Sequence, residues 1–134
     1  MTPDEAAEMM AWLREQLDAE ERAARVIAGP GDRWQADYVD PYGYMDQSVR
    51  EHILRHNPTR VLAEVAAKRA ILDLHSPTSD RMGLDETTWT YGDIDPACST
   101  CGASDYARPW PCETIKVLTR SFAGQPGWRE GWQA

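Results

Sequence analysis

Long apolar runs are absent from this sequence of 134 residues, and its longest basic cluster is Lys68-Arg69. No stretch approaches the roughly 18 apolar residues of a membrane-spanning helix. The N-terminus, Met1-Thr2-Pro3-Asp4, also lacks the basic start and apolar segment of a signal peptide. The net charge is −8, and phosphate binding needs clustered Lys and Arg instead. We therefore expect a cytoplasmic protein that binds neither membranes nor nucleic acids.

Two common catalytic signatures are missing as well. The sequence has no glycine-rich loop that could hold a phosphate and no serine motif typical of nucleophilic hydrolases. Hydrophobic residues make up 42% of the chain and charged residues 27%, which is ordinary for a folded protein. Composition thus predicts one folded domain, over residues 1–134, without naming a molecular target.

The first expected element is a long helix over residues 3–27. Thr2 can cap this helix, and Pro3 suits its first position. Met9, Leu13 and Leu17 recur at intervals of four residues, which is the spacing of one helix face. Glycine and proline at residues 29–31 then end the pattern.

Two further helices are expected over residues 46–56 and 58–75. Asn57 as a cap and Pro58 at a first helical position separate them. Val65, Leu72 and His75 fall on one narrow stripe of the second helix. His75 should therefore leave its helix on the core side.

A short hairpin is expected over residues 34–45. Aromatic and β-branched residues surround Asp40-Pro41 there, and Gly43 adds a second turn signal. The aromatic side chains could stack on a ligand ring, but in a small protein they more often contribute core area.

All three cysteines, Cys98, Cys101 and Cys112, lie late in the sequence. In a reducing compartment, closely spaced cysteines typically bind metal or perform redox chemistry. Cys98 and Cys101 form a C-x-x-C motif followed by Gly102, the tight form of a zinc knuckle. Cys112 stands at a predicted helix start, where the helix dipole favours a thiolate. With His75 as the fourth donor, these residues predict one zinc ion per chain.

Three alternatives compete with this ligand set. Cys98 and Cys101 could form a thioredoxin-like redox pair, although that would leave Cys112 without a partner. His75 could be an ordinary histidine that interacts with the last carbonyls of its helix. His52 and His56, four residues apart on one helix, are the other candidate donors, but no H-E-x-x-H motif surrounds them.

The pattern favours a structural metal over a catalytic one. Zinc deaminases combine H-x-E with P-C-x-x-C, and the glutamate moves protons. Here Ser76 and Pro77 follow His75, so that glutamate is missing. Four protein donors would also fill a tetrahedral zinc and leave no position for water. We predict no catalytic residues and no cofactor beyond the structural zinc, and we lean against an enzyme.

Several of these motifs together carry a resemblance to a known family. The segment HILRHNPTRVLAEVAAKRAILDLH at residues 52–75, the C-x-x-C, PWPCETIKVL and the terminal PGWREGW resemble small proteins of unknown function from actinobacteria and their phages. The resemblance covers most of the chain and implies a fold unit with a zinc site at His75, Cys98, Cys101 and Cys112. It implies no activity. A long insertion before the C-x-x-C, at residues 76–97, departs from the family pattern.

The predicted fold is mainly α with minor β structure. It consists of a helical core with a short hairpin in residues 1–75, followed in residues 76–134 by a zinc-knuckle-like segment, a short helix and an aromatic tail. In the tail, Phe122, Trp128 and Trp132 are costly to leave in water. We expect them to dock on the first helix around Trp12, although a partner surface is the alternative destination.

Two classes of function remain open at this level. The first is a zinc-stabilised protein that interacts with or modulates a protein partner, in the manner of an accessory protein. The second is a small zinc-dependent hydrolase or deaminase-like enzyme. Metal analysis combined with activity screening would separate them.

Overall fold

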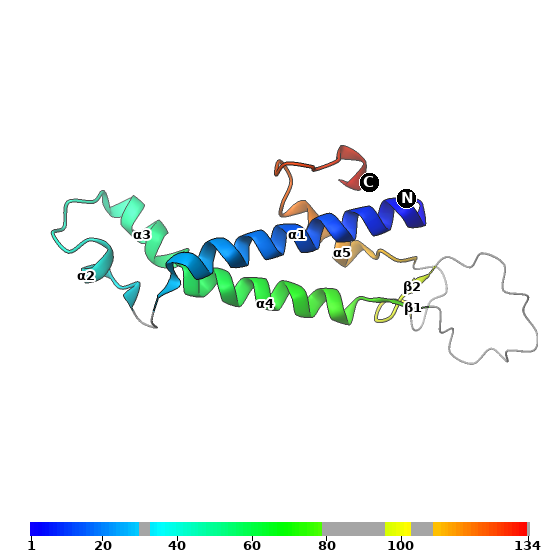
Figure 1. Cartoon of the computed structure of the whole chain (residues 1–134), viewed down its shortest axis with the longest axis horizontal. Helices are drawn as coiled ribbons and strands as arrows, with labels where there is room; N and C mark the ends of the chain where they lie inside the picture. The colour runs from blue at the N-terminus through cyan, green and yellow to red at the C-terminus, as the bar shows by residue number, and fades with distance from the viewer. Residues whose placement is uncertain (30–32, 79–95, 103–108, 134) are drawn as a thin grey trace, which may run out of the picture. The chain divides into compact units, whose positions relative to one another are not determined.

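A computed structural model describes residues 1–29, 33–78, 96–102 and 109–133 (Figure 1). The chain forms two compact units: Met1–Arg14 with Lys68–Ala134, and Glu15–Ala67. The long helices α1 (Pro3–Ala28) and α4 (Pro58–Leu74) each contribute residues to both. The protein is mainly helical, as the sequence predicts, and no described helix has the length and apolar character needed to cross a membrane.

The three main helices begin and end close to their expected positions. They are α1, α3 (Gln47–Arg55) and α4. At the start of α1, the Glu5 N–H donates to the Thr2 hydroxyl at 3.1 Å, while the Thr2 N–H donates to the Glu5 carboxylate at 2.6 Å. This reciprocal capping satisfies two backbone donors and lowers the pKa of Glu5. Asn57 caps α4 in a similar way, since its side-chain oxygen accepts from the Arg60 N–H at 3.0 Å.

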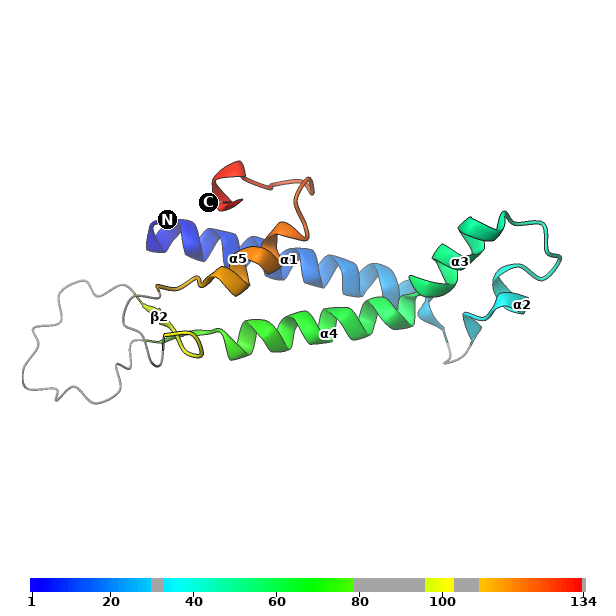
Figure 2. The ribbon, with the colours of Figure 1, turned by 180° about the vertical axis from the view of Figure 1, so that it is seen from behind.

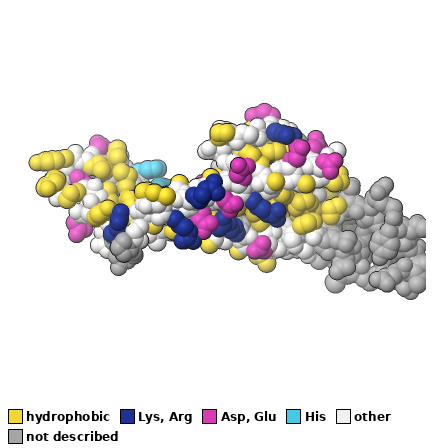
Figure 3. Space-filling model, in the orientation of Figure 1, with side chains coloured by type: hydrophobic (Ala, Val, Ile, Leu, Met, Phe, Trp, Pro, Cys, Tyr) yellow, Lys and Arg dark blue, Asp and Glu magenta, His cyan; other side chains and the backbone are white. Residues whose placement is uncertain are grey.

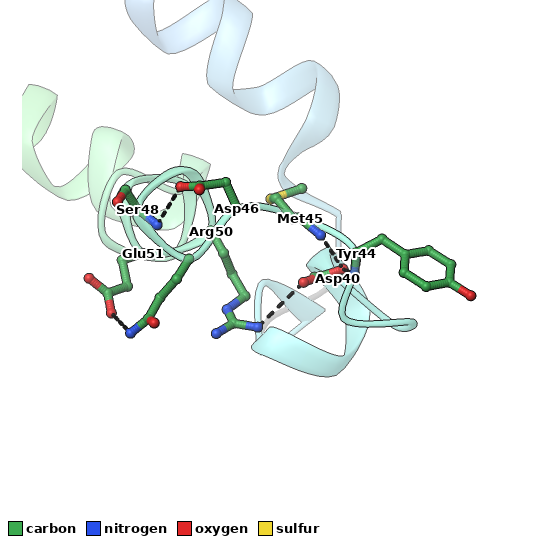
Figure 4. Close-up of polar contacts among 8 residues, drawn as sticks. Asp40, Tyr44, Met45, Asp46, Ser48, Arg50 and Glu51 are labelled. Atoms are coloured by element: carbon green, nitrogen blue, oxygen red, sulfur yellow. Dashed lines mark hydrogen bonds and ion pairs between the residues drawn. The ribbon is translucent and has the colours of Figure 1, made fainter.

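The prediction of a hairpin over residues 34–45 is wrong. This region forms the short helix α2 (Ala36–Val39) and a loop that leads into α3. The buried carboxylate of Asp40 accepts from the N–H groups of Tyr44 at 3.0 Å and Met45 at 3.3 Å, and it pairs with Arg50 at 3.4 Å (Figure 4). The Asp40 side chain therefore accepts from backbone N–H groups that would have bonded to the opposite strand in a hairpin.

The first unit contains most of the core. Its buried hydrophobic side chains come from α1, the end of α4, the cysteine-containing segment, α5 (Glu113–Arg120) and the residues after it: Ala6, Met9, Met10, Trp12, Leu13, Leu72, Cys98, Cys112, Ile115, Phe122 and Trp132. Figures 1 and 2 both show α5 and the 3₁₀ helix η2 (Glu130–Gln133) beside the N-terminal half of α1. Thr119, the buried polar residue of α5, is satisfied because its hydroxyl donates to the Ile115 carbonyl at 2.8 Å.

The aromatic tail docks on Trp12, which confirms the expectation of self-docking. The ring of Trp12 lies 5.6 Å from that of Trp128 and 5.1 Å from that of Trp132, measured between centroids. Its indole N–H donates to the Pro126 carbonyl at 2.9 Å. Gly127 has φ +86°, and an added Cβ would lie only 2.9 Å from the Trp12 indole nitrogen. Glycine is therefore required where the tail passes over this ring.

A small antiparallel pair of strands leads to the cysteines. β1 (Pro77–Thr78) follows α4 and pairs with β2 (Ala97–Cys98), with Pro77 opposite Cys98. Beyond β2, the Trp110 N–H donates to the Pro96 carbonyl at 2.8 Å. Most of the insertion at residues 76–97 lies outside the described residues, but both of its ends are held next to α4.

Candidate metal centre

His75 follows the last residue of α4, and its backbone is fixed on both sides. Its N–H donates to the Ile71 carbonyl at 3.0 Å and so continues the helical pattern by one residue. Its own carbonyl accepts from the indole N–H of Trp110 at 2.9 Å. The imidazole is therefore directed by a helix end and by the segment that precedes Cys112.

Cys98 and Cys101 lie on a tight turn after β2. The Cys101 N–H approaches the Cys98 sulfur at 3.4 Å, and the Gly102 N–H donates to the Cys98 carbonyl at 2.8 Å. An added Cβ at Gly102 would lie 2.8 Å from that carbonyl oxygen and 3.0 Å from the Ala97 Cβ. The turn therefore needs glycine directly after the second cysteine.

The two residues between these cysteines attach the turn to α4. The hydroxyl groups of Ser99 and Thr100 both donate to the carbonyl of Leu74, at 3.0 Å in the case of Ser99. The Ser99 N–H also donates to the Ser76 carbonyl at 2.9 Å. A carbonyl that the end of the helix leaves without an intrahelical partner is thus satisfied by the C-x-x-C turn itself. This role was not predicted, and its only signal in the sequence is the pair of hydroxyl residues between the two cysteines.

Cys112 occupies the N-cap position of α5. Its backbone is extended, with φ −74° and ψ 168°, and its side chain makes no capping hydrogen bond. The sulfur is therefore available to the other donors at the positive end of the helix dipole. This arrangement is the one expected from the sequence, in which Pro111-Cys112 precedes the helical pattern.

The four donors converge on one point. The His75 Nδ1 atom lies 3.4 Å from the sulfur of Cys98, 3.5 Å from that of Cys101 and 3.4 Å from that of Cys112. All four ligand atoms lie within 4.8 Å of one another. For Zn–N of about 2.0 Å and Zn–S of about 2.3 Å, a tetrahedron separates neighbouring N and S donors by about 3.5 Å. The three distances from His75 Nδ1 to the sulfurs match this value.

Hydrogen bonding alone does not account for this convergence. In a neutral imidazole, Nδ1 either donates one proton or accepts one, so it can satisfy one sulfur but not three. A cation at the centre would attract the three sulfurs as thiolates and the nitrogen lone pair at once. The arrangement is therefore compatible with a metal site.

The sequence profile of a family of unknown function, DUF6221, matches residues 6–134. The chain belongs to this family. No curated protein and no solved structure matches it. Membership in DUF6221 agrees with the resemblance seen in the sequence and assigns no activity, so the chemistry has to be argued from the donors.

Burial and local hydrogen bonds give two of the cysteines of this DUF6221 chain different acidities. For Cys98, burial favours the thiol, but the backbone N–H groups of Cys101 and Thr100 and the side chain of His75 outweigh it, and the pKa falls from 9.0 to about 7. For Cys101, burial and the neighbouring sulfurs of Cys112 and Cys98 raise the pKa from 9.0 to about 11. Without a metal, Cys98 therefore holds a thiolate more readily than Cys101 does.

Neither alternative histidine belongs to this cluster of the DUF6221 chain. The cluster found among the described residues consists of His75 and the three cysteines. His52 and His56 instead stack on each other at the end of α3, with ring centroids 4.5 Å apart, and both are exposed. The three cysteines form no disulfide, and all three lie in the cluster with His75.

Proposed function

We propose that His75, Cys98, Cys101 and Cys112 hold one zinc ion per chain. Three thiolates and an imidazole form a common donor set of structural zinc, and soft sulfur donors disfavour magnesium and calcium. The observation that carries the proposal is the near-equal spacing of the His75 nitrogen from three sulfurs, 3.4–3.5 Å. That spacing agrees with the edge length of a tetrahedral zinc site.

The donor count supports a structural role for this zinc. Catalytic zinc sites keep one position for water or substrate, whereas four protein donors close a tetrahedral ion. The residue after His75 is Ser76, whose hydroxyl lies 3.2 Å from that of Ser99. In the H-x-E motif of zinc deaminases, the proton-transferring glutamate stands two residues after the histidine, and that position is Pro77 here. We therefore favour a structural metal over the hydrolase or deaminase alternative.

The zinc would connect three parts of the first unit. His75 comes from the end of α4, Cys98 and Cys101 from the turn after β2, and Cys112 from the start of α5. In small zinc peptides, binding contributes about 10–16 kcal/mol to folding at neutral pH. An ion at this junction would therefore be a major source of stability for a small core.

For the protein as a whole, we propose a zinc-stabilised accessory protein that acts through a protein partner in the cytoplasm. The reducing cytoplasm would keep the three cysteines available to the metal. The net charge of −8 disfavours nucleic acid as the partner. The resemblance to proteins of actinobacteria and their phages suggests that a lysate of an actinobacterium is the appropriate source of partners.

Metal analysis together with activity screening tests this proposal. The purified chain should contain one zinc, and the loaded protein should show no metal-dependent hydrolysis or deamination that Cys101→Ser abolishes. Affinity capture should recover a specific protein with the zinc-loaded chain and not with Cys101→Ser. A folded, metal-free protein would contradict the zinc assignment, while a zinc-dependent activity would favour the enzyme alternative.

A further inference from the structure

The segment over residues 33–56, here called the α2–α3 segment, has no buried apolar residue. All of its residues are described, and each is half-buried or exposed. Neither α2 nor α3 has a buried side chain. A segment of this length normally repays the entropy of ordering by burying apolar side chains. The described residues supply no such compensation to the α2–α3 segment.

Polar contacts hold the backbone of the segment in place. Asp40 accepts from two backbone N–H groups and pairs with Arg50, and Asp46 caps α3 by accepting from the Ser48 N–H at 2.9 Å (Figure 4). Trp34 attaches the start of the segment to α1, since its indole N–H donates to the Ala28 carbonyl at 2.9 Å. The side chains of the segment are therefore presented from a defined backbone.

Those side chains include a group of exposed aromatic and aliphatic residues. Tyr38 is 51% exposed, Tyr42 79%, Tyr44 91% and Val49 51%. The rings of Tyr42 and Tyr44, on either side of Gly43, are stacked with centroids 6.0 Å apart and an angle of 24° between planes. Figure 3 shows hydrophobic side chains gathered over this part of the molecule. Tyrosines on a fixed backbone are typical of protein interfaces, because they add contact area at low entropic cost.

The charge of the segment restricts the partner. It contains three arginines and four acidic residues, a net charge of −1 when the histidines are neutral. This segment therefore carries little of the chain's net charge of −8. A nucleic acid would need a basic surface, and a strongly charged protein would need a surface of the opposite sign. A nearly neutral surface with both signs fits a partner that also has both signs.

We propose that the α2–α3 segment is the interface through which two copies of this chain form a symmetric dimer. In a two-fold interface the same surface meets itself, so its charges and apolar groups must be self-complementary. Asp37, Glu51 and Arg55 are exposed and supply both signs, and the stacked tyrosines supply apolar contact. This dimer lies beyond the proposed zinc-dependent role and does not depend on the metal.

The exposed area is of the right size for such a contact. The exposed fractions of Tyr38, Tyr42 and Tyr44 together amount to a little over two whole side chains. At about 150–250 Å² for each aromatic side chain, the tyrosines alone offer roughly 330–550 Å². A standard interface buries about 800 Å² on each partner. The tyrosines would thus provide about half of the contact, and the flanking polar residues the rest.

Sedimentation equilibrium of the zinc-loaded chain over a wide concentration range tests the proposal. We expect a reversible monomer–dimer equilibrium. The double variant Tyr42→Ser/Tyr44→Ser should raise the dimer dissociation constant at least about tenfold, which corresponds to about 1.4 kcal/mol. Val117→Ser is the matched control, because Val117 is a 54% exposed apolar residue on α5, outside the segment. It should leave the dimer unchanged.

Two further measurements make the result decisive. Circular dichroism and zinc content should be the same in the double variant and the original chain, which separates loss of the dimer from loss of the fold. Amide hydrogen exchange over residues 33–56 should slow as the concentration of the original chain rises. A chain that is monomeric at all concentrations, or a dimer that persists unchanged in Tyr42→Ser/Tyr44→Ser, would overturn the proposal. Recovery of a different protein bound to the same tyrosines by a monomeric chain would overturn it as well.

Discussion

The hydroxyl of Ser99 donates a hydrogen bond of 3.0 Å to the carbonyl oxygen of Leu74, the last residue of α4. The C-x-x-C turn therefore caps the helix that His75 follows. Because the Ser99 N–H also donates to the Ser76 carbonyl at 2.9 Å, the turn is positioned by hydrogen bonds in addition to any metal. We therefore expect Ser99 to position the turn without taking part in metal binding.

Ser99→Ala should lower stability without removing the metal. Loss of a hydroxyl that satisfies a helix-end carbonyl should reduce the free energy of unfolding by about 0.5–1.5 kcal/mol, while Thr100 still donates to the same oxygen. Zinc content should remain one per chain. Ser48→Ala, an exposed change at the start of α3, should alter stability by less than about 0.5 kcal/mol. Chemical unfolding with parallel metal analysis measures both quantities, and loss of zinc from Ser99→Ala would contradict this division of roles.

His75→Ala should lose zinc, whereas the double variant His52→Ala/His56→Ala should retain it. The reason is geometric, since His75 lies 3.4–3.5 Å from all three sulfurs while His52 and His56 stack elsewhere. Cobalt substitution is the suitable measurement, because visible bands of a tetrahedral cobalt–thiolate site report both coordination and geometry. An unchanged cobalt spectrum in His75→Ala would remove this histidine from the ligand set.

Gly102→Ala should weaken metal binding by distorting the turn. The new Cβ would lie 2.8 Å from the backbone oxygen of Cys98, a contact that side-chain rotation does not relieve. We expect zinc affinity to fall about tenfold or more, which corresponds to a loss of at least about 1.4 kcal/mol in the free energy of zinc binding. Gly131→Ala is the control, because open space surrounds Gly131. Competition with a chromophoric chelator measures the affinities, and equal values for the two variants would refute the steric argument.

Zinc binding should release unequal numbers of protons from Cys98 and Cys101. The pKa of Cys98 is lowered to about 7 and that of Cys101 is raised to about 11. At a pH between these values, the folded metal-free chain holds Cys98 mainly as thiolate and Cys101 mainly as thiol. Metal binding then displaces nearly a full proton from Cys101 but only a fraction from Cys98.

Calorimetry in buffers of different ionisation enthalpy measures this release. Acidification through the pKa of Cys98 should raise the number of protons displaced and lower the apparent zinc affinity. In the metal-free chain, the two cysteines change the folding stability with pH in opposite directions. The lowered pKa of Cys98 stabilises the folded chain above pH 9.0, and this contribution is lost as the pH falls to about 7. The raised pKa of Cys101 stabilises the folded chain below pH 9.0, and this contribution is lost as the pH rises to about 11. Proton release that does not vary with pH would contradict the assignment.

Trp132→Ala should strongly destabilise the first unit. Trp132 is 4% exposed and its ring is tilted against that of Trp12, with centroids 5.1 Å apart, so its removal leaves a large cavity. We expect a loss of about 3–5 kcal/mol in the free energy of unfolding. Val117→Ala, which truncates an exposed side chain, should cost far less. Thermal unfolding of both variants and of a chain truncated after Gly124 tests the docking, and similar melting temperatures for all three would contradict it.

The sequence was most informative where one local pattern determines the outcome. Four-residue spacing, together with caps such as Thr2 and Asn57, set the helix bounds to within about two residues. The clustering of His75 with the three cysteines was also predictable, because the C-x-x-C turn limits the local geometry and few other residues of this kind are available. The docking of Trp132 on Trp12 followed from the cost of leaving large rings in water.

Features that depend on a distant or competing acceptor were not predictable. The turn residues around Asp40 are compatible with a hairpin, and the outcome was decided by its carboxylate accepting from Tyr44 and Met45. The Ser99 hydroxyl finds its acceptor at Leu74, 25 residues earlier in the chain. A periodic pattern in the sequence does not predict a hydrogen bond between residues that far apart. The single-domain prediction over residues 1–134 stays a prediction.

The distance along the chain between Trp12 and its partners has a consequence for biosynthesis. The Trp12 indole bonds to Pro126, 114 residues later, and Cys112 follows His75 by 37 residues. On a translating ribosome, α1 and α4 can form as helices while their apolar faces still lack the covering residues. The nascent chain must therefore pass through a stage with exposed Trp12 and an incomplete donor set.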